Sequence, residues 1–431
     1  MVSQLTSVVA AIGLWHAMPS AAAIIPPSVL TADASIGACK LAGDAVLGFD
    51  LSEGVVPAGS SVVRGWMMFV DFPDAEAAGY TAQGVYDNSV AKANAWYQTS
   101  SYGRLSLNVS ADVDHIYRMA KPSTAYDWAN HGTSYNQMVF IEDALDAYMQ
   151  VHGIAEAADL KASLPEMDVL YVVTPPSTPN FDVSYGSRYA AQTRSHNGTD
   201  GNVVEGAEVS KGYVTFGTGF FREETKSDGS GVNPAKIFVH ETAHTLGLPD
   251  YYPMGFGLLE GEYVGGFSIM GSIGEQAPDM FAFDKWRMGW LDDSAVHCVT
   301  EKGTSTTHVL QPLEADGATG GVRAVMIPTS NTTALVAEAR ITKGVDASFC
   351  GVGVLLYTID TKVRSGYGPV RVVNTLESEL RWCGGYSLNE APLSFIRYRS
   401  PSKTIKDLGI TITLIEHDES INTWTIKVDY I

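Results

Sequence analysis

The run His-Glu-Thr-Ala-His at residues 240–244 combines two imidazoles and a carboxylate at a spacing that suits metal chemistry. Residues four positions apart lie on the same face of a helix, so the imidazoles of His240 and His244 can reach one cation. Glu241 stands beside that cation, where a base for metal-activated water is needed. The spacing therefore predicts a catalytic zinc site with Glu241 as general acid/base. The alternative is a core helix that carries two ordinary, partly buried histidines.

A third ligand is expected shortly after the second histidine. Gly247 supplies a left-handed residue that ends the helix, and a chain that reverses there brings Asp250 back to the metal. Two imidazoles and a carboxylate leave the fourth tetrahedral position open to water, which is typical of catalytic zinc sites. Pro249-Asp250 is also ordinary turn chemistry, so other carboxylates compete for this role. The competitors are Glu260, Glu262 and Glu275.

The residues around the motif predict the elements that position it. Asn233 is a preferred N-cap, and Pro234 suits the first helical position. Residues 237–239, Ile-Phe-Val, give the helix an apolar side. Further on, a glycine-flanked turn at 265–272 carries Met270, which we expect to form a hydrophobic floor beneath the metal. Without a metal nearby, it would be an ordinary buried methionine.

Apolar periodicity predicts further elements on both sides of this helix. Upstream strands are expected at 62–72, 106–113, 169–173 and 213–216, and helices at 89–100, 138–148 and 279–290. After Asp293 the pattern is strand after strand, at 308–313, 322–327, 334–340, 353–359, 411–415 and 423–428. We therefore expect a mixed α+β fold, with a catalytic domain at 60–295 and a β-sandwich-like C-terminal domain at 296–431.

Composition narrows the classes of partner. The chain has 431 residues, 45% of them hydrophobic, which favours a globular protein of two domains. Its net charge of −20 does not favour nucleic acid or anionic lipid as a partner. No apolar stretch has the length and continuity of a membrane span. The sequence does not indicate an oligomeric state.

The N-terminus and the cysteines indicate export. An apolar run before Ala21-Ala22-Ala23 predicts a signal peptide at 1–23, although no Lys or Arg precedes Lys40. Residues 24–59 are expected to be a lead-in or short pro-segment. The alternative for the N-terminus is a buried segment of the mature fold.

Four cysteines permit two disulfides with three possible pairings, and Cys350 with Cys383 is the preferred bridge. Four reduced thiols are the alternative. A separate hypothesis leaves Cys39 unpaired, with its thiolate blocking the zinc until the leader is removed.

Beyond these features, several segments resemble the immune inhibitor A family of secreted metallopeptidases. The similar segments are 240–251, the Gly-Phe-Ser-Ile-Met-Gly turn at 266–271, and Lys-Trp-Arg-Met-Gly-Trp-Leu at 285–291. Weaker similarity covers 69–74, 101–105, 336–340 and 353–357. The resemblance implies a metzincin-like catalytic domain with His240, His244 and Asp250 as zinc ligands and Glu241 as acid/base. Aspartate stands where metzincins usually have a third histidine. Structural calcium is also implied, although no loop assigns it to residues.

The expected function is a secreted zinc endopeptidase that acts on protein or peptide substrates. A tyrosine is expected to help hold the oxyanion, and three are near enough in sequence: Tyr251, Tyr252 and Tyr263. One alternative is an exported non-catalytic binding or adhesion protein with a vestigial zinc site, against which the intact Glu241 argues. Another is a zinc hydrolase of a small amide or ester.

Overall fold

The structure is a computed structural model. It describes residues 36–43, 54–126, 128, 134–197, 203–204, 206–223, 232–254, 257–274, 278–317, 320–376, 383, 385–396 and 399–431. All of these belong to one compact unit, residues 34–431. The expected signal peptide at 1–23 and the competing ligand Glu275 lie outside the described residues.

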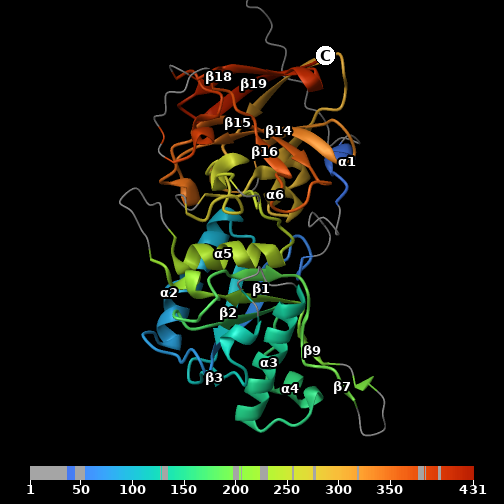
Figure 1. Cartoon of the computed structure of the whole chain (residues 1–431). Helices are drawn as coiled ribbons and strands as arrows, with labels where there is room; N and C mark the ends of the chain where they lie inside the picture. Colours follow the sequence, from blue (N-terminus) through green and yellow to red (C-terminus); the bar gives the residue numbers. More distant parts are fainter. Residues whose placement is uncertain are drawn as a thin grey trace, which may run out of the picture. The chain divides into compact units, whose positions relative to one another are not determined.

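A six-stranded sheet organises the first half of this unit (Figure 1). Its order is β2 (Ser106–Ala111), β1 (Val62–Asp71), β4 (Val169–Val173), β10 (Gly212–Phe216) and β5 (Tyr185–Ser187), and β3 (Tyr117–Arg118) pairs with β1. These strands run parallel except β5, which pairs antiparallel with β10 and forms one edge. Parallel strands are covered on both faces, and β4 accordingly has five buried residues in a row.

Helices cover both faces of this sheet. α2 (Ala82–Ser100) and α5 (Pro234–Thr245) share one hydrophobic cluster with residues such as Met67 and Phe216. α3 (Ser134–His152) and α4 (Ala157–Ser163) share a second cluster with alternate sheet residues such as Met68 and Leu170. Two short ladders flank the sheet: β6 (Ala191–Gln192) with β9 (Glu208–Ser210), and β7 (His196–Asn197) with β8 (Val203–Val204).

Two further sheets follow α6 (Ala282–Arg287). The five-stranded sheet has the order β11 (Val296–Cys298), β13 (Ala324–Pro328), β14 (Thr333–Arg340), β15 (Gly353–Asp360) and β16 (Val370–Val372). The four-stranded sheet has the order β12 (Thr304–Leu310), β19 (Thr423–Tyr430), β18 (Ile410–Asp418) and β17 (Ser402–Ile405). Side chains from both sheets form a third cluster, in which Leu356 of β15 and Ile426 of β19 are fully buried.

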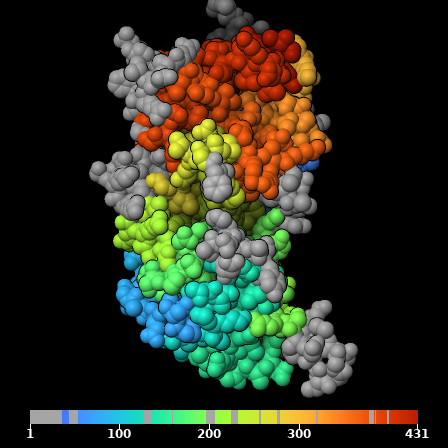
Figure 2. Space-filling model, viewed as in Figure 1, coloured from blue at the N-terminus to red at the C-terminus, as the bar shows by residue number. Residues whose placement is uncertain are grey.

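The opposite face of the five-stranded sheet joins the core of the first half. Val336 and Tyr357 belong to the same cluster as Phe281 and Trp286. The rings of Phe281 and Tyr357 have centroids 4.5 Å apart. The two halves of the chain therefore share a core across the expected boundary at 295/296, and Figure 2 shows yellow residues from before this boundary lying against orange residues from after it.

Two disulfides tie distant parts of the chain together. Cys350 is bonded to Cys383, as predicted. Cys39, at the end of α1 (Ile36–Cys39), is bonded to Cys298, so the hypothesis of an unpaired, zinc-blocking Cys39 is wrong. The bridge holds part of the expected lead-in on the core, where Cys39 and Leu41 are buried.

The structure confirms the mixed α+β class and the longer predicted strands. α2 begins seven residues earlier than the predicted helix, at Ala82, because Thr81 provides an N-cap that accepts a hydrogen bond from Gly84. α6 is shorter than predicted and ends at Arg287, two residues before left-handed Gly289. Among the described residues, no helix has the length and apolar character to cross a membrane.

Candidate metal centre

Helix α5 carries the predicted motif, and its ends follow the predicted rules. The Asn233 side chain accepts a hydrogen bond from the Lys236 N–H, and Pro234 is the first helical residue. Gly247 has a φ of +93°, the left-handed conformation that glycine adopts without steric penalty, just past the helix end. The helix is buried on nearly every side, so its backbone is fixed by packing against the sheet.

Three side-chain atoms converge at one point beside this helix. Asp250 Oδ1 lies 3.2 Å from His240 Nε2 and 3.1 Å from His244 Nε2, and the two nitrogens are 3.2 Å apart. The other ring nitrogens are occupied. His240 Nδ1 lies 2.9 Å from the Ile269 carbonyl oxygen, and His244 Nδ1 lies 2.7 Å from that of Leu248. Both rings therefore turn Nε2 toward Asp250, which is how metal-binding histidines are usually oriented.

The spacing of these three atoms fits a metal of zinc's size. Bonds of about 2.0–2.1 Å in tetrahedral geometry separate neighbouring ligand atoms by about 3.3 Å. Asp250 Oδ1 is also buried, and its polar neighbours are the two imidazole nitrogens. A buried carboxylate oxygen is expensive unless a cation or a protonated imidazole balances it. The donor set of two imidazoles and one carboxylate thus suits Zn²⁺.

The electrostatics of the cluster also call for positive charge. Burial acts to lower the pKa of His244, but the carboxylates of Asp250 and Glu241 raise it to about 9. Burial raises the pKa of Glu241 above its ordinary value, and the charge of Asp250 adds to this. Two buried carboxylates beside two imidazoles require a compensating charge, which a proton or a bound cation supplies.

The Asp250 carboxylate is held from the C-terminal half of the chain. Ser365 lies in the connection between β15 and β16, and its hydroxyl donates to Asp250 Oδ2 at 3.1 Å. The Asp250 N–H donates to Ser365 Oγ at 2.8 Å, and the Gly366 N–H donates to the Asp250 carbonyl at 3.0 Å. No motif in the sequence pointed to Ser365, because nothing local links it to the zinc helix.

The edge strand β5 borders the site. The backbone of Gly186 approaches α5 so closely that a Cβ atom there would overlap the Glu241 carbonyl oxygen. This close approach lets the Gly186 N–H donate a hydrogen bond to the Glu241 side chain. The adjoining pocket has a volume of about 680 Å³ and includes Tyr185 and Tyr189 beside the three ligands. The sequence analysis did not predict this strand, which has only three residues.

The other predicted site residues are placed as follows. Met270 is fully buried in the first core cluster, and the neighbouring Ile269 carbonyl is what contacts His240. Glu260 and Glu262 are exposed and do not join the cluster, so among the carboxylates that the structure describes it is Asp250 that meets both imidazoles.

The three predicted tyrosines lie in different surroundings. Tyr252 lines the pocket, and its ring stacks near His240 with centroids 6.1 Å apart. The hydroxyl of Tyr251 is buried and donates to Asp284 at 2.7 Å. The ring of Tyr263 lies beneath the Arg371 guanidinium, 4.1 Å away. Tyr252 is therefore the one of the three that borders the pocket.

Comparison with known proteins adds no assignment. No family model matches the chain, and no curated protein matches it.

Proposed function

We propose that this protein is a secreted zinc endopeptidase related to the immune inhibitor A metallopeptidases, with a metzincin-like catalytic region. The observation that carries the proposal is the triangle of His240 Nε2, His244 Nε2 and Asp250 Oδ1, with sides of 3.1–3.2 Å, next to the buried Glu241. The two disulfides support export, since such bonds persist in oxidising compartments. A calcium requirement stays a prediction without assigned residues.

The proposed chemistry is hydrolysis of a peptide bond. Held by His240, His244 and Asp250, Zn²⁺ would supply Lewis acidity that makes water more acidic and a carbonyl more electrophilic. Glu241 accepts the proton of the attacking water and returns it to the leaving amine. Burial raises the pKa of Glu241, which favours its taking up a proton. Tyr252 lines the pocket and its hydroxyl hydrogen-bonds Asp250, and we expect this hydroxyl to turn and donate to the developing oxyanion.

An extended polypeptide suits the site better than a small amide or ester. β5 is an edge strand, and edge strands bind extended peptides through main-chain hydrogen bonds. The pocket continues along this strand from Val183 to Tyr189 instead of closing around the three ligands. A chain laid along β5 would pass directly over Glu241, whose side chain accepts a hydrogen bond from Gly186 in the same strand.

The test is casein hydrolysis by the parent and by Glu241→Gln, with the zinc content of both measured. The substitution keeps the size of the side chain and removes the base. We expect about one zinc at this centre in each protein and a loss of at least 10³-fold in the hydrolysis rate. Glu419→Gln, an exposed site far along the chain, should leave the rate unchanged.

Two other outcomes would contradict the proposal in different ways. If the parent binds zinc at this centre but cleaves neither casein nor a peptide library, the alternative of a binding or adhesion protein with a vestigial zinc site replaces it. If zinc content does not change when His240 and His244 are replaced by alanine, the metal centre itself is wrong. Cleavage of small esters or amides but of no peptide would reassign the substrate class.

A further inference from the structure

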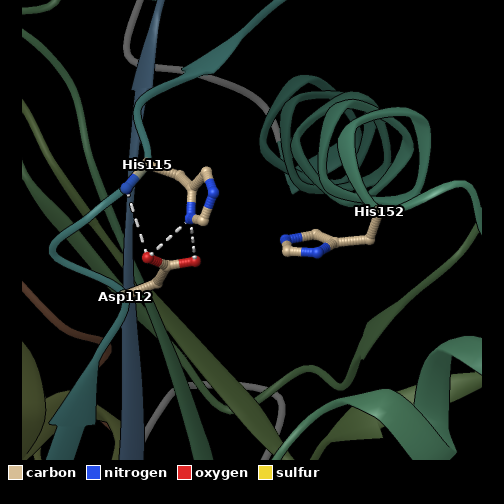
Figure 3. A group of neighbouring side chains, drawn as sticks. All are labelled: Asp112, His115 and His152. Carbon is tan, nitrogen blue, oxygen red and sulfur yellow. Dashed lines mark hydrogen bonds and ion pairs between the residues drawn. The ribbon is translucent and has the colours of Figure 1, made fainter.

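A second cluster of metal-ligand side chains lies on the opposite side of the six-stranded sheet from α5. Asp112 and His115 belong to the connection between β2 and β3, and His152 is the last residue of α3. One ligand atom from each of the three residues lies within 4.8 Å of the other two. Figure 3 shows His115 and His152 with their rings on either side of one space, and Asp112 at its border.

The carboxylate of Asp112 is fixed before any metal is considered. Its Oδ1 accepts hydrogen bonds from the backbone N–H groups of Asp114 at 3.1 Å and His115 at 3.2 Å. Its Oδ2 accepts a hydrogen bond from the Tyr117 hydroxyl. His115 Nδ1 lies 3.0 Å from each carboxylate oxygen. The two side chains are thus hydrogen-bonded to each other and lie close enough for one small cation to replace the shared proton.

Aromatic contacts orient both imidazoles. The ring of His152 packs on Tyr148 with centroids 4.3 Å apart, and its Nε2 lies 2.9 Å from the Tyr117 hydroxyl oxygen. The ring of His115 stacks near Tyr117, with centroids 5.9 Å apart. The two imidazoles meet edge to face at 5.3 Å. Such supporting contacts are typical of the groups that hold metal ligands in place.

We propose that Asp112, His115 and His152 form a second binding site for a divalent transition-metal ion, most suitably Zn²⁺. Imidazole nitrogens favour zinc, nickel and copper, whereas calcium and magnesium require sites built from oxygen. Three protein ligands leave the fourth tetrahedral position open. Water can occupy it because His115 and His152 are both exposed. The inference does not depend on the proposed peptidase activity.

Binding there requires only side-chain movement. The three ligand atoms lie within 4.8 Å of one another, and rotation of the two exposed rings can bring them toward the separation of about 3.3 Å that zinc ligands have. His115 would bind the ion through Nδ1 and carry its proton on Nε2. The cation shared with Asp112 would then replace the hydrogen bond between the two residues. The bound ion would link the β2–β3 connection to the end of α3. Since the unfolded chain lacks this arrangement, zinc should stabilise the fold.

The test is calorimetric titration of Zn²⁺ into chelator-treated, dialysed protein. We expect the parent to bind two ions and His115→Gln/His152→Gln to bind one. The double variant should keep casein hydrolysis once reloaded with zinc. The single variants His115→Gln and Asp112→Asn should each weaken the second site at least tenfold. His417→Gln, which removes a histidine outside both clusters, should bind as the parent does.

The outcomes separate this site from the centre on α5. One ion in the parent and none in the double variant supports the second site and removes zinc from the proposed catalytic centre. Equal stoichiometry and affinity in the parent and the double variant overturn the second site, whether one or two ions bind. In that case the cluster is a hydrogen-bonded surface network only. Circular dichroism of each variant verifies that the comparison is between folded proteins.

Discussion

Asp250 and Ser365 exchange hydrogen bonds across 115 residues of sequence: the backbone N–H of Asp250 donates to Ser365 Oγ, and the Ser365 hydroxyl donates to Asp250 Oδ2. The remaining oxygen of the carboxylate, Oδ1, is left facing the two imidazoles. The segment after β15 therefore helps to set the position of a proposed metal ligand. This assigns the C-terminal half a direct part in building the candidate site.

The first prediction concerns this pair. Ser365→Ala removes the hydroxyl that orients Asp250 and leaves the three ligand atoms intact. We expect zinc affinity at the α5 centre to fall about 10–100-fold, the range typical for removal of such supporting groups. Competition with a zinc-binding dye measures it. Ser330→Ala, in a turn away from the site, is the control, and equal affinities for the two variants would show that Ser365 does not position the ligand.

Gly186 gives a steric prediction. In Gly186→Ala the new methyl group would overlap the Glu241 carbonyl oxygen and lie 2.8 Å from His244 Cβ, so β5 must move away from α5. Overpacking of this kind is expected to destabilise the protein by about 1–3 kcal/mol. Urea unfolding and casein hydrolysis should both report the change. Gly37→Ala is the matched control, since a Cβ there meets no atom within 4 Å.

The tyrosines should separate catalysis from stability. Tyr252→Phe removes a hydroxyl at the pocket, and we expect kcat to fall about 10–100-fold with Tm little changed. Tyr251→Phe removes the hydrogen bond to the buried Asp284 and should lower stability by about 1 kcal/mol or more. Thermal unfolding and kcat are measured on both variants. A loss of kcat in Tyr251→Phe but not in Tyr252→Phe would contradict the catalytic role of Tyr252.

A pH dependence follows from His308 in β12. Burial, with the nearby His297 adding, lowers the pKa of His308 from 6.5 to about 4. The folded protein therefore takes up a proton less readily than the unfolded chain. The contribution of His308 to the free energy of unfolding is fully present above about pH 6.5. It is lost as the pH falls toward 4, which should destabilise the protein by about 1–3 kcal/mol.

Unfolding at pH 7.5, 5.5 and 4.5 tests this prediction. His308→Gln should reduce the loss of Tm between pH 7.5 and 4.5, because the variant has no proton to take up at this position. His417→Gln serves as the control for removing a histidine from the same sheet. An identical acid-side loss in the parent and His308→Gln would refute the assignment.

Local chemistry explains which parts of the fold were predictable from sequence. The helix at Pro234–Thr245 was predictable because its cap, its first proline and its terminal glycine are neighbours in the chain. β4 matched its predicted bounds because a fully buried parallel strand is a continuous apolar run. β5 and β16 have three residues each, which is too short for any periodicity to register.

Long-range pairing limits what the sequence can reveal about the sites. Asp250 lies close to the two imidazoles, as a third ligand would, because Gly247 and the turn after it follow the helix directly in the sequence. Ser365 and the Asp112–His152 cluster depend on segments brought together by tertiary packing, and no motif marks them in advance. The pairing of Cys39 with Cys298, 259 residues apart, was likewise open among three choices.

That same bridge has a consequence for the fate of the molecule after synthesis. Every ligand of the proposed centre on α5 lies within the covalent ring that Cys39 and Cys298 close. A single proteolytic nick between these two cysteines would open the ring without releasing a fragment. The nicked molecule would keep its mass, apart from one added water, until a reductant separated its two polypeptides on a gel.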